Sequence, residues 1–276
     1  MSQATDNLAF IKWLQARLNA LGATPELLVD GWAPLGGKTH TAARILFPLN
    51  PSDPPNSSDL PISGLLLSKS AIEILINFEI GDETYYSKYL AKPTWPGASS
   101  GVTIGIGYDL GYNDTETFQH DWAAQLDPDA GAILEPACGR TSSNAKSWLS
   151  GHPEARAIAI PLPTAQAVFR ATTLPKFAAL TKATFPGIEL LQPDAQTMLV
   201  SLVYNRGAAI YGDSRREMLT IRNRLLVVLE NGHVTQADLT YIAGQIRSMK
   251  RLWSSSALAG LHKRRDREAS IIESGI

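Results

Sequence analysis

The chain has one cysteine and no excess of charge of either sign. Cys138 is the only cysteine among 276 residues, which excludes an intrachain disulfide and a cysteine metal cluster. Lys and Arg number 25 against 26 for Asp and Glu, so no global charge attracts nucleic acid or an anionic membrane. Nucleic-acid binding is therefore not expected. Membrane insertion is not expected either, because no apolar run approaches the roughly 18 residues of a membrane helix.

Several kinds of functional motif are missing as well. The five histidines show no metal-ligand spacing, and the chain has neither a Gly-rich phosphate loop nor a serine-nucleophile motif. We therefore expect no cofactor and no metal. The start, Met1–Asn7, is polar and lacks a basic region followed by an apolar stretch, so we expect synthesis in the cytoplasm without a signal peptide.

A shift in composition divides the chain. Residues 48–63 are rich in proline, serine and asparagine, and they predict a linker over 49–64. The unit before it, 1–48, has apolar residues at helical spacing, which predicts a small helical module. The larger domain follows over 65–276.

The small module resembles a known wall-binding unit. Its segments "LQARLNALG", "VDG" and "GGKTHTAARILF" are similar to the small peptidoglycan-binding domain that accompanies many wall hydrolases, although the aromatic-rich ending of that family is imperfect here. The resemblance implies that residues 1–48 bind peptidoglycan. The alternative is a helical cap that packs on the larger domain.

The larger domain begins with a predicted helix over 68–78, which ends near Glu79. Ser70 and Glu73 have the spacing of a capping box at its start. A polar loop follows, and its aromatic residues either stack on sugars or fill a lobe of the domain. These aromatic residues are Tyr85, Tyr86, Tyr89 and Trp95.

Most of the remaining sequence is helical in pattern. Residues 102–108 alternate between apolar and small or polar side chains, which predicts extended chain. Helical periodicity marks later segments at 164–183, 194–204, 215–230 and 236–253. The expected fold is therefore mainly α with one small sheet, and residues 112–163 carry no clear assignment.

The order of these segments resembles one enzyme superfamily. Glu79 at a helix end, the aromatic loop and "GVTIGIGYDLG" are similar to the phage-type lysozymes, which include T-even phage lysozyme and pesticin. The resemblance implies an α+β lysozyme-like fold, with a β-hairpin at the cleft beside a helical lobe. It also implies catalysis by a Glu, a Thr and an Asp, which we assign to Glu79, Thr103 and Asp109.

The spacing of this trio is like that of pesticin. Thr103 follows Glu79 by 24 positions, and Asp109 follows Thr103 by 6. In T-even phage lysozyme the Asp precedes the Thr, but here the only acids between Glu79 and Thr103 are Asp82 and Glu83, which crowd the helix end. We therefore assign the second carboxylate to Asp109.

Glycoside cleavage explains why two carboxylates are needed. One acid protonates the leaving oxygen while a base activates water, and a single carboxyl cannot hold both protonation states. We expect Ile76 and Phe78 to provide an apolar wall that keeps Glu79 protonated. A water between Thr103 and Asp109 gives an inverting reaction, with the carboxyls roughly 6.5 to 9.5 Å apart.

This assignment requires the extended segment to bend. Six residues of straight strand span roughly 20 Å, which would carry Asp109 out of reach of a water held by Thr103. Glycine adopts backbone angles that are closed to other residues. We therefore predict a tight turn or bulge within 105–107.

Two later segments, "LVSLVYNRG" and "GLHKRRDREASII", also resemble this superfamily. The resemblance implies that Asn205 binds an N-acetyl group or a peptide amide and that Arg206 pairs with a peptide carboxylate. A helix cap and a structural ion pair are the alternatives. Tyr108, inside the glycine-rich motif, is also assigned to substrate binding, while the basic run 263–267 is expected to face solvent.

The expected function is a muramidase that cuts the bond between N-acetylmuramic acid and N-acetylglucosamine in peptidoglycan. The alternatives are a lytic transglycosylase, which needs one acid only, and a catalytically silent wall-binding protein. Action in the periplasm requires delivery by a phage holin, by a secretion machine such as type VI, or by bacteriocin-like import. A secreted effector implies an immunity protein as partner.

Overall fold

The computed structural model describes residues 59–254 and 258–274. The peptidoglycan-binding module predicted over 1–48 therefore lies outside the described residues, as do residues 49–58 of the predicted linker. Residues 58–276 form one structural unit. This unit begins slightly before the boundary at residue 65 that the sequence predicts.

Helices make up most of the described residues, which confirms the prediction of a mainly α fold. The α-helices are α3 (Lys69–Ile80), α4 (Glu83–Tyr85), α5 (Thr115–Trp122), α6 (Pro128–Leu134), α7 (Ser142–Gly151), α8 (Pro153–Ala157), α9 (Leu162–Val168), α10 (Leu174–Thr184), α11 (Pro193–Arg206), α12 (Arg216–Asn231), α13 (Gln236–Ser248) and α14 (Ala259–Ser274). Among the described residues, no helix is both long and apolar enough to cross a membrane.

In the part of the chain that the structure describes, four short strands form two antiparallel pairs instead of the single sheet that we expected. The first pair joins β1 (Asp59–Ile62) to β2 (Leu65–Ser68), so part of the predicted linker is strand. Its two-residue turn has positive φ at both Ser63 and Gly64, the geometry that suits a tight hairpin. The linker prediction is wrong here because apolar side chains on both sides of this turn pair and pack.

Helix α3 has its N-cap two residues before the predicted capping box. The side chain of Ser68 accepts a hydrogen bond from the backbone N–H of Ala71, so Ser68 and not Ser70 caps the helix. Glu73 pairs instead with Arg170. Ile72, Leu75 and Ile76 face the core, and the helix ends at Gly81, beside Glu79.

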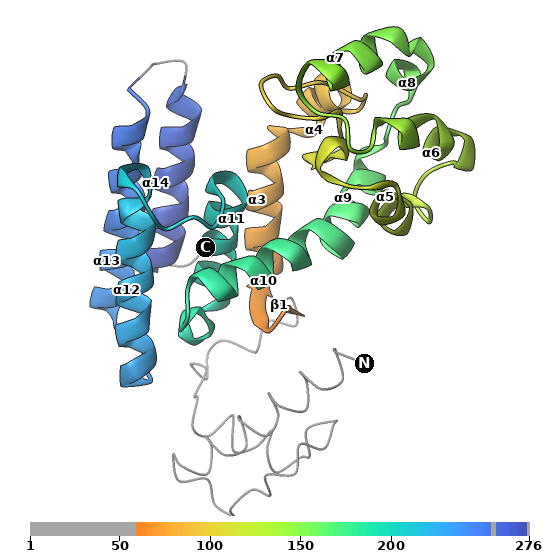
Figure 1. Ribbon diagram of the computed structural model, residues 1–276. Coiled ribbons are helices and arrows are strands. Elements are labelled where there is room, and N and C mark those ends of the chain that lie inside the picture. The colour runs from red at the N-terminus through yellow and green to blue at the C-terminus, as the bar shows by residue number, and fades with distance from the viewer. Residues whose placement is uncertain (1–58, 255–257, 275–276) are drawn as a thin grey trace, which may run out of the picture. The chain divides into compact units, whose positions relative to one another are not determined.

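Helix α11 is the centre of the helical layer. Every residue from 195 to 203 is buried, which is the pattern of a helix covered on all sides. It packs against α3, α10, α14 and β2, and Figure 1 shows it between α3 and α14. The helices predicted at 194–204, 215–230 and 236–253 are confirmed as α11, α12 and α13, the last extended by the turn η7 (Met249–Leu252).

The segment predicted as a helix over 164–183 is also confirmed. It contains α9 and α10, joined without a break by the π-helical turn η4 (Phe169–Thr173). Residues 112–163, which the sequence left unassigned, form the short helices α5 to α8 (Figure 1). Phe118 and Trp122 of α5 are buried and join this region to the core.

The second hairpin confirms the predicted bend. Strand β3 (Thr103–Ile104) pairs with β4 (Tyr108–Asp109), and Thr103 lies directly opposite Asp109. The turn between them has positive φ at Gly105 and Gly107. A Cβ on Gly105 would also lie 2.9 Å from the Trp122 ring, so glycine is required here both for conformation and for space.

This dual requirement predicts that Gly105→Ala lowers the free energy of unfolding by about 1–3 kcal/mol. The matched control is Gly131→Ala in α6, where an added Cβ meets nothing within 4 Å. Because alanine favours helix over glycine, the control should gain up to about 1 kcal/mol. Urea unfolding measures both variants, and equal stability of the two would contradict the prediction.

Candidate active site

Glu79 lies in the last turn of α3, and its side chain is 22% exposed. Its Oε1 accepts a hydrogen bond of 2.6 Å from Nη1 of Arg264, on α14. The apolar wall that we expected is not what contacts this oxygen. Ile76 faces the core. The Phe78 ring lies 5.0 Å from the Arg264 guanidinium, so it packs against the partner of Glu79.

Arg264 belongs to a buried cluster of charges. Its Nε donates to Glu268 at 3.1 Å, and its Nη2 donates to the carbonyl and the hydroxyl of Ser201. Arg265 is fully buried and also pairs with Glu268. Burial alone lowers the pKa of Arg264, but the carboxylates of Glu268 and Glu79 outweigh burial and raise it above its usual value.

This cluster corrects part of the expectation that residues 263–267 face solvent, because Lys263 and Arg267 are exposed but the two arginines between them are not. Arg264 and Arg265 are among the buried charged residues of the chain. The spacing of Arg264 and Arg265 before Glu268, four and three positions on a helix, was the signal for this cluster. The clustered charges hold Arg264 fixed beneath Glu79.

Thr103 and Asp109 lie side by side on the second hairpin. Residues directly opposite each other in an antiparallel pair place their side chains on the same face. Both residues are partly exposed. On its other side, Thr103 exchanges two backbone hydrogen bonds with Thr94, so the residue is held between two segments of chain.

The Asp109 carboxylate is bound by backbone amides. Its Oδ1 accepts from the N–H groups of Gly101 and Gly111, at 3.0 and 2.8 Å, while Oδ2 accepts only from Gly101. A Cβ on Gly101 would collide with Oδ1 and with the Gly111 backbone. Because a carboxylate oxygen accepts two hydrogen bonds, Oδ2 keeps more capacity to accept a proton or a water.

Tyr204, in the last turn of α11, contacts this hairpin and senses the charge of Glu79. Its hydroxyl donates to the carbonyl of Ile106, in the hairpin turn, at 3.2 Å. Burial, and then the negative charge of Glu79, raise the pKa of the Tyr204 hydroxyl. Sequence reasoning missed this residue, although it stands next to Asn205 in a segment that had been singled out.

The structure places Tyr108 in the core. Its ring is buried and meets Trp122 edge-on, with centroids 5.5 Å apart. Its hydroxyl donates to Asp121 at 2.9 Å, and burial followed by this bond raises the Tyr108 pKa. Such surroundings favour packing over the predicted contact with substrate, whereas Asn205 is exposed at the end of α11.

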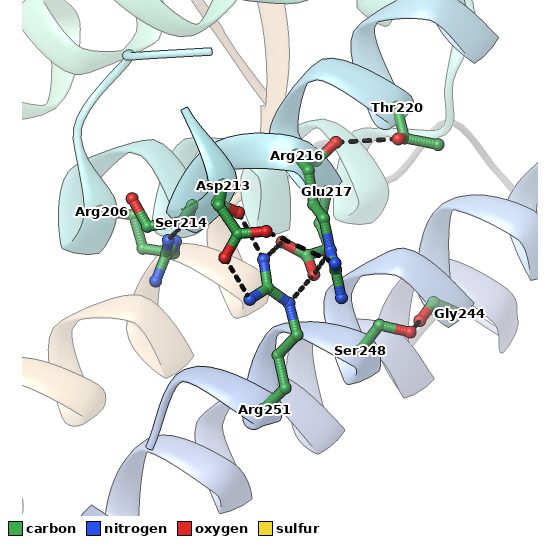
Figure 2. Close-up of polar contacts among 9 residues, drawn as sticks. All are labelled: Arg206, Asp213, Ser214, Arg216, Glu217, Thr220, Gly244, Ser248 and Arg251. Atoms are coloured by element: carbon green, nitrogen blue, oxygen red, sulfur yellow. Dashed lines mark hydrogen bonds and ion pairs between the residues drawn. The ribbon is translucent and has the colours of Figure 1, made fainter. Parts of the chain in front are cut away.

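Arg206 takes part in structural contacts. Its Nη2 donates to the carbonyl of Ser214 at 2.6 Å, as Figure 2 shows, and its guanidinium lies 5.1 Å from the Trp253 ring centre. Burial first, and then the charges of Arg215 and Arg265, lower the Arg206 pKa to about 10. These contacts favour the structural alternative that the sequence left open.

Beside Arg206, a second charge network holds the start of α12 (Figure 2). Glu217 is buried and accepts hydrogen bonds from Arg251 at 2.6 Å and from Arg216 at 3.2 Å. Arg251 also donates hydrogen bonds to the carboxylate and to the backbone carbonyl of Asp213. The network joins the residues before α12 to the turn after α13.

Within 59–254 and 258–274, no group of three or more His, Cys, Asp or Glu side chains lies so as to hold a metal ion. The described site offers two carboxyl groups, a threonine hydroxyl and a fixed guanidinium.

Part of the chain matches a family model. A family model described as a domain of unknown function (DUF8812) matches residues 76–179. The matched segment includes Glu79, Thr103 and Asp109, and it ends before Tyr204 and Arg264. No curated protein and no solved structure matches the chain.

The charge network around Glu217 predicts a loss of stability in acid. Burial alone raises the Glu217 pKa, but hydrogen bonds from Arg251 and Arg216 outweigh burial and hold it below its ordinary value of 4.5. Glu217 therefore stabilises the fold fully above pH 4.5, and this contribution is lost as the pH falls through the lower folded pKa.

We expect Glu217→Gln to lose less unfolding free energy than the parent between about pH 6 and about pH 3. Urea unfolding at the two pH values measures this loss. Glu154→Gln, an exposed position on α8, should behave like the parent. An identical loss in Glu217→Gln and the parent would show that the network does not drive acid sensitivity.

Proposed function

We propose that this protein is a peptidoglycan hydrolase of the muramidase type, with a lysozyme-like fold. The reaction is cleavage of the β-1,4 bond between N-acetylmuramic acid and N-acetylglucosamine. One observation carries the proposal: Glu79, at a helix end, is held by buried Arg264, while a second hairpin pairs Thr103 directly with Asp109. Tyr204 hydrogen-bonds the turn of that hairpin, and the charge of Glu79 contributes to the raised pKa of Tyr204.

In the proposed mechanism Glu79 is the proton donor. It protonates the glycosidic oxygen, so that the bond to the anomeric carbon breaks and the leaving sugar departs as an alcohol. Arg264 orients the Glu79 carboxyl, and its charge is divided between Glu79 and Glu268. This sharing supports a role for Arg264 as a positioning residue.

Asp109 and Thr103 supply the attacking water. The Thr103 hydroxyl and Oδ2 of Asp109 hold a water on the face of the sugar opposite Glu79. Oδ2 takes the proton as the oxygen of the water bonds to the anomeric carbon, and the configuration inverts. Oδ2 accepts one backbone hydrogen bond, whereas Oδ1 accepts two, and this difference supports Oδ2 as the atom that takes the proton.

Glu79→Gln is expected to reduce release of reducing ends from purified peptidoglycan by about 10²-fold or more, because glutamine cannot donate the proton. Glu83→Gln, a change of the same kind at an exposed acid on α4, should keep parental activity. Activity of Glu79→Gln equal to that of the parent would end the proposal. Thermal unfolding of both variants checks that each is folded.

Asp109→Asn separates the proposed base from a purely structural carboxylate. Loss of the charged acceptor should cost about 1 kcal/mol of stability through weaker bonds to the Gly101 and Gly111 amides. Loss of the base should reduce hydrolysis by about 10²-fold well below the melting temperature.

The products of Asp109→Asn decide between the two enzymatic mechanisms. Mass spectrometry distinguishes reducing ends, which hydrolysis makes, from anhydro-muropeptides, which a lytic transglycosylase makes with one acid. If the Asp109→Asn variant is folded, fully active and yields anhydro products, the reaction is transglycosylation and not hydrolysis. The parent is expected to yield reducing ends.

A further inference from the structure

Two exposed tyrosines stand next to the end of α3. Tyr85 closes α4, and Tyr89 lies in the π-helical turn η1 (Tyr86–Leu90). Their side chains are about half exposed, 50% and 49%, and their ring centroids are 4.7 Å apart at an angle of 46°. Residues four apart in a helical segment share one face, so the two rings form one aromatic surface, which we call the tyrosine pair.

The backbone beneath the tyrosine pair is anchored. Tyr86 is buried, its hydroxyl donates to the carbonyl of Ile160 at 3.0 Å, and burial raises its pKa to about 12. Ile160 in turn donates its N–H to the Ala91 carbonyl at 2.7 Å. Bonds at both ends of η1 hold the pair in place before any ligand arrives, which lowers the entropy cost of binding.

The tyrosine pair lies close to Glu79. A Cβ built on Gly81 would be 3.5 Å from both Cβ and Cγ of Tyr85, so this ring packs against Gly81. Gly81 follows Glu79 by two positions, and two residues span at most about 7 Å. Figure 1 shows α4 at the end of α3 that carries Glu79.

From these contacts we propose that the tyrosine pair is a saccharide subsite. It binds an N-acetylhexosamine unit of a glycan strand, next to the bond that Glu79 protonates; this inference rests on the proposed function. A pyranose ring has a face of C–H bonds, which stacks on an aromatic ring and removes two apolar surfaces from water. The exposed hydroxyls of the tyrosines meet the polar edge of the sugar.

Charge also suits a glycan strand of peptidoglycan. The ammonium of Lys88 lies 5.0 Å from the centre of the Tyr89 ring, and Lys88 is itself exposed. It covers part of Tyr89 and places a positive charge at the edge of the pair. A carboxylate on the lactyl group or peptide of a muramyl unit would be attracted there.

The test measures binding without turnover. The full chain carrying Glu79→Gln is titrated with chitotetraose, a soluble tetramer of N-acetylglucosamine, in a calorimeter. Adding Tyr85→Ala and Tyr89→Ala together should weaken binding by about tenfold or more, a factor that corresponds to about 1.4 kcal/mol. The double change to phenylalanine keeps the rings and should retain most of the affinity.

The matched control is Tyr241→Ala in the same Glu79→Gln background. Tyr241 is 44% exposed but lies on α13, so its loss should leave the affinity unchanged. Equal affinity of the double alanine variant and its parent would overturn the subsite, and so would failure of the parent to bind chitotetraose. Digestion of peptidoglycan by the wild-type chain tests the proposed function separately, so the two failures are distinguishable.

Discussion

The hydrogen-bonded ion pair between Arg264 and Glu79 is the contact on which the rest of the candidate site depends. It joins the end of α3 to α14 across the buried helix α11. Arg264 is held in turn by Ser201 of α11 and by Glu268 of its own helix. Three helices therefore meet at one guanidinium, and the position of the Glu79 carboxyl follows from how they pack.

The charges in this cluster balance, because Arg264 and Arg265 face Glu79 and Glu268. Taking charges out of water is costly, and the cost is offset only where each charge keeps its partners. Removing any one member leaves the cluster with an uncompensated net charge. The cluster therefore specifies one arrangement of α14 against α11, whatever its net contribution to stability.

How much the sequence predicts depends on the range of the interactions. Periodicity located α11, α12 and α13, and the two glycines located the turn between Thr103 and Asp109, because these signals are local. Local spacing misassigned the cap of α3 and the last part of the linker. The contact of Glu79 with Arg264 joins residues 185 positions apart, and no local pattern encodes it. The burial of Tyr108 was not predicted for a related reason, because its partner Asp121 lies on another element.

Because 185 positions separate Glu79 from Arg264, the two halves of this ion pair are synthesised at different times. Glu79 belongs to the first helix described, whereas Arg264 belongs to the last. A chain still growing on the ribosome holds the carboxyl group and the hairpin long before it holds the guanidinium that orients them. The candidate site is therefore complete only after α14 has been synthesised, and a product truncated before α14 lacks its central ion pair.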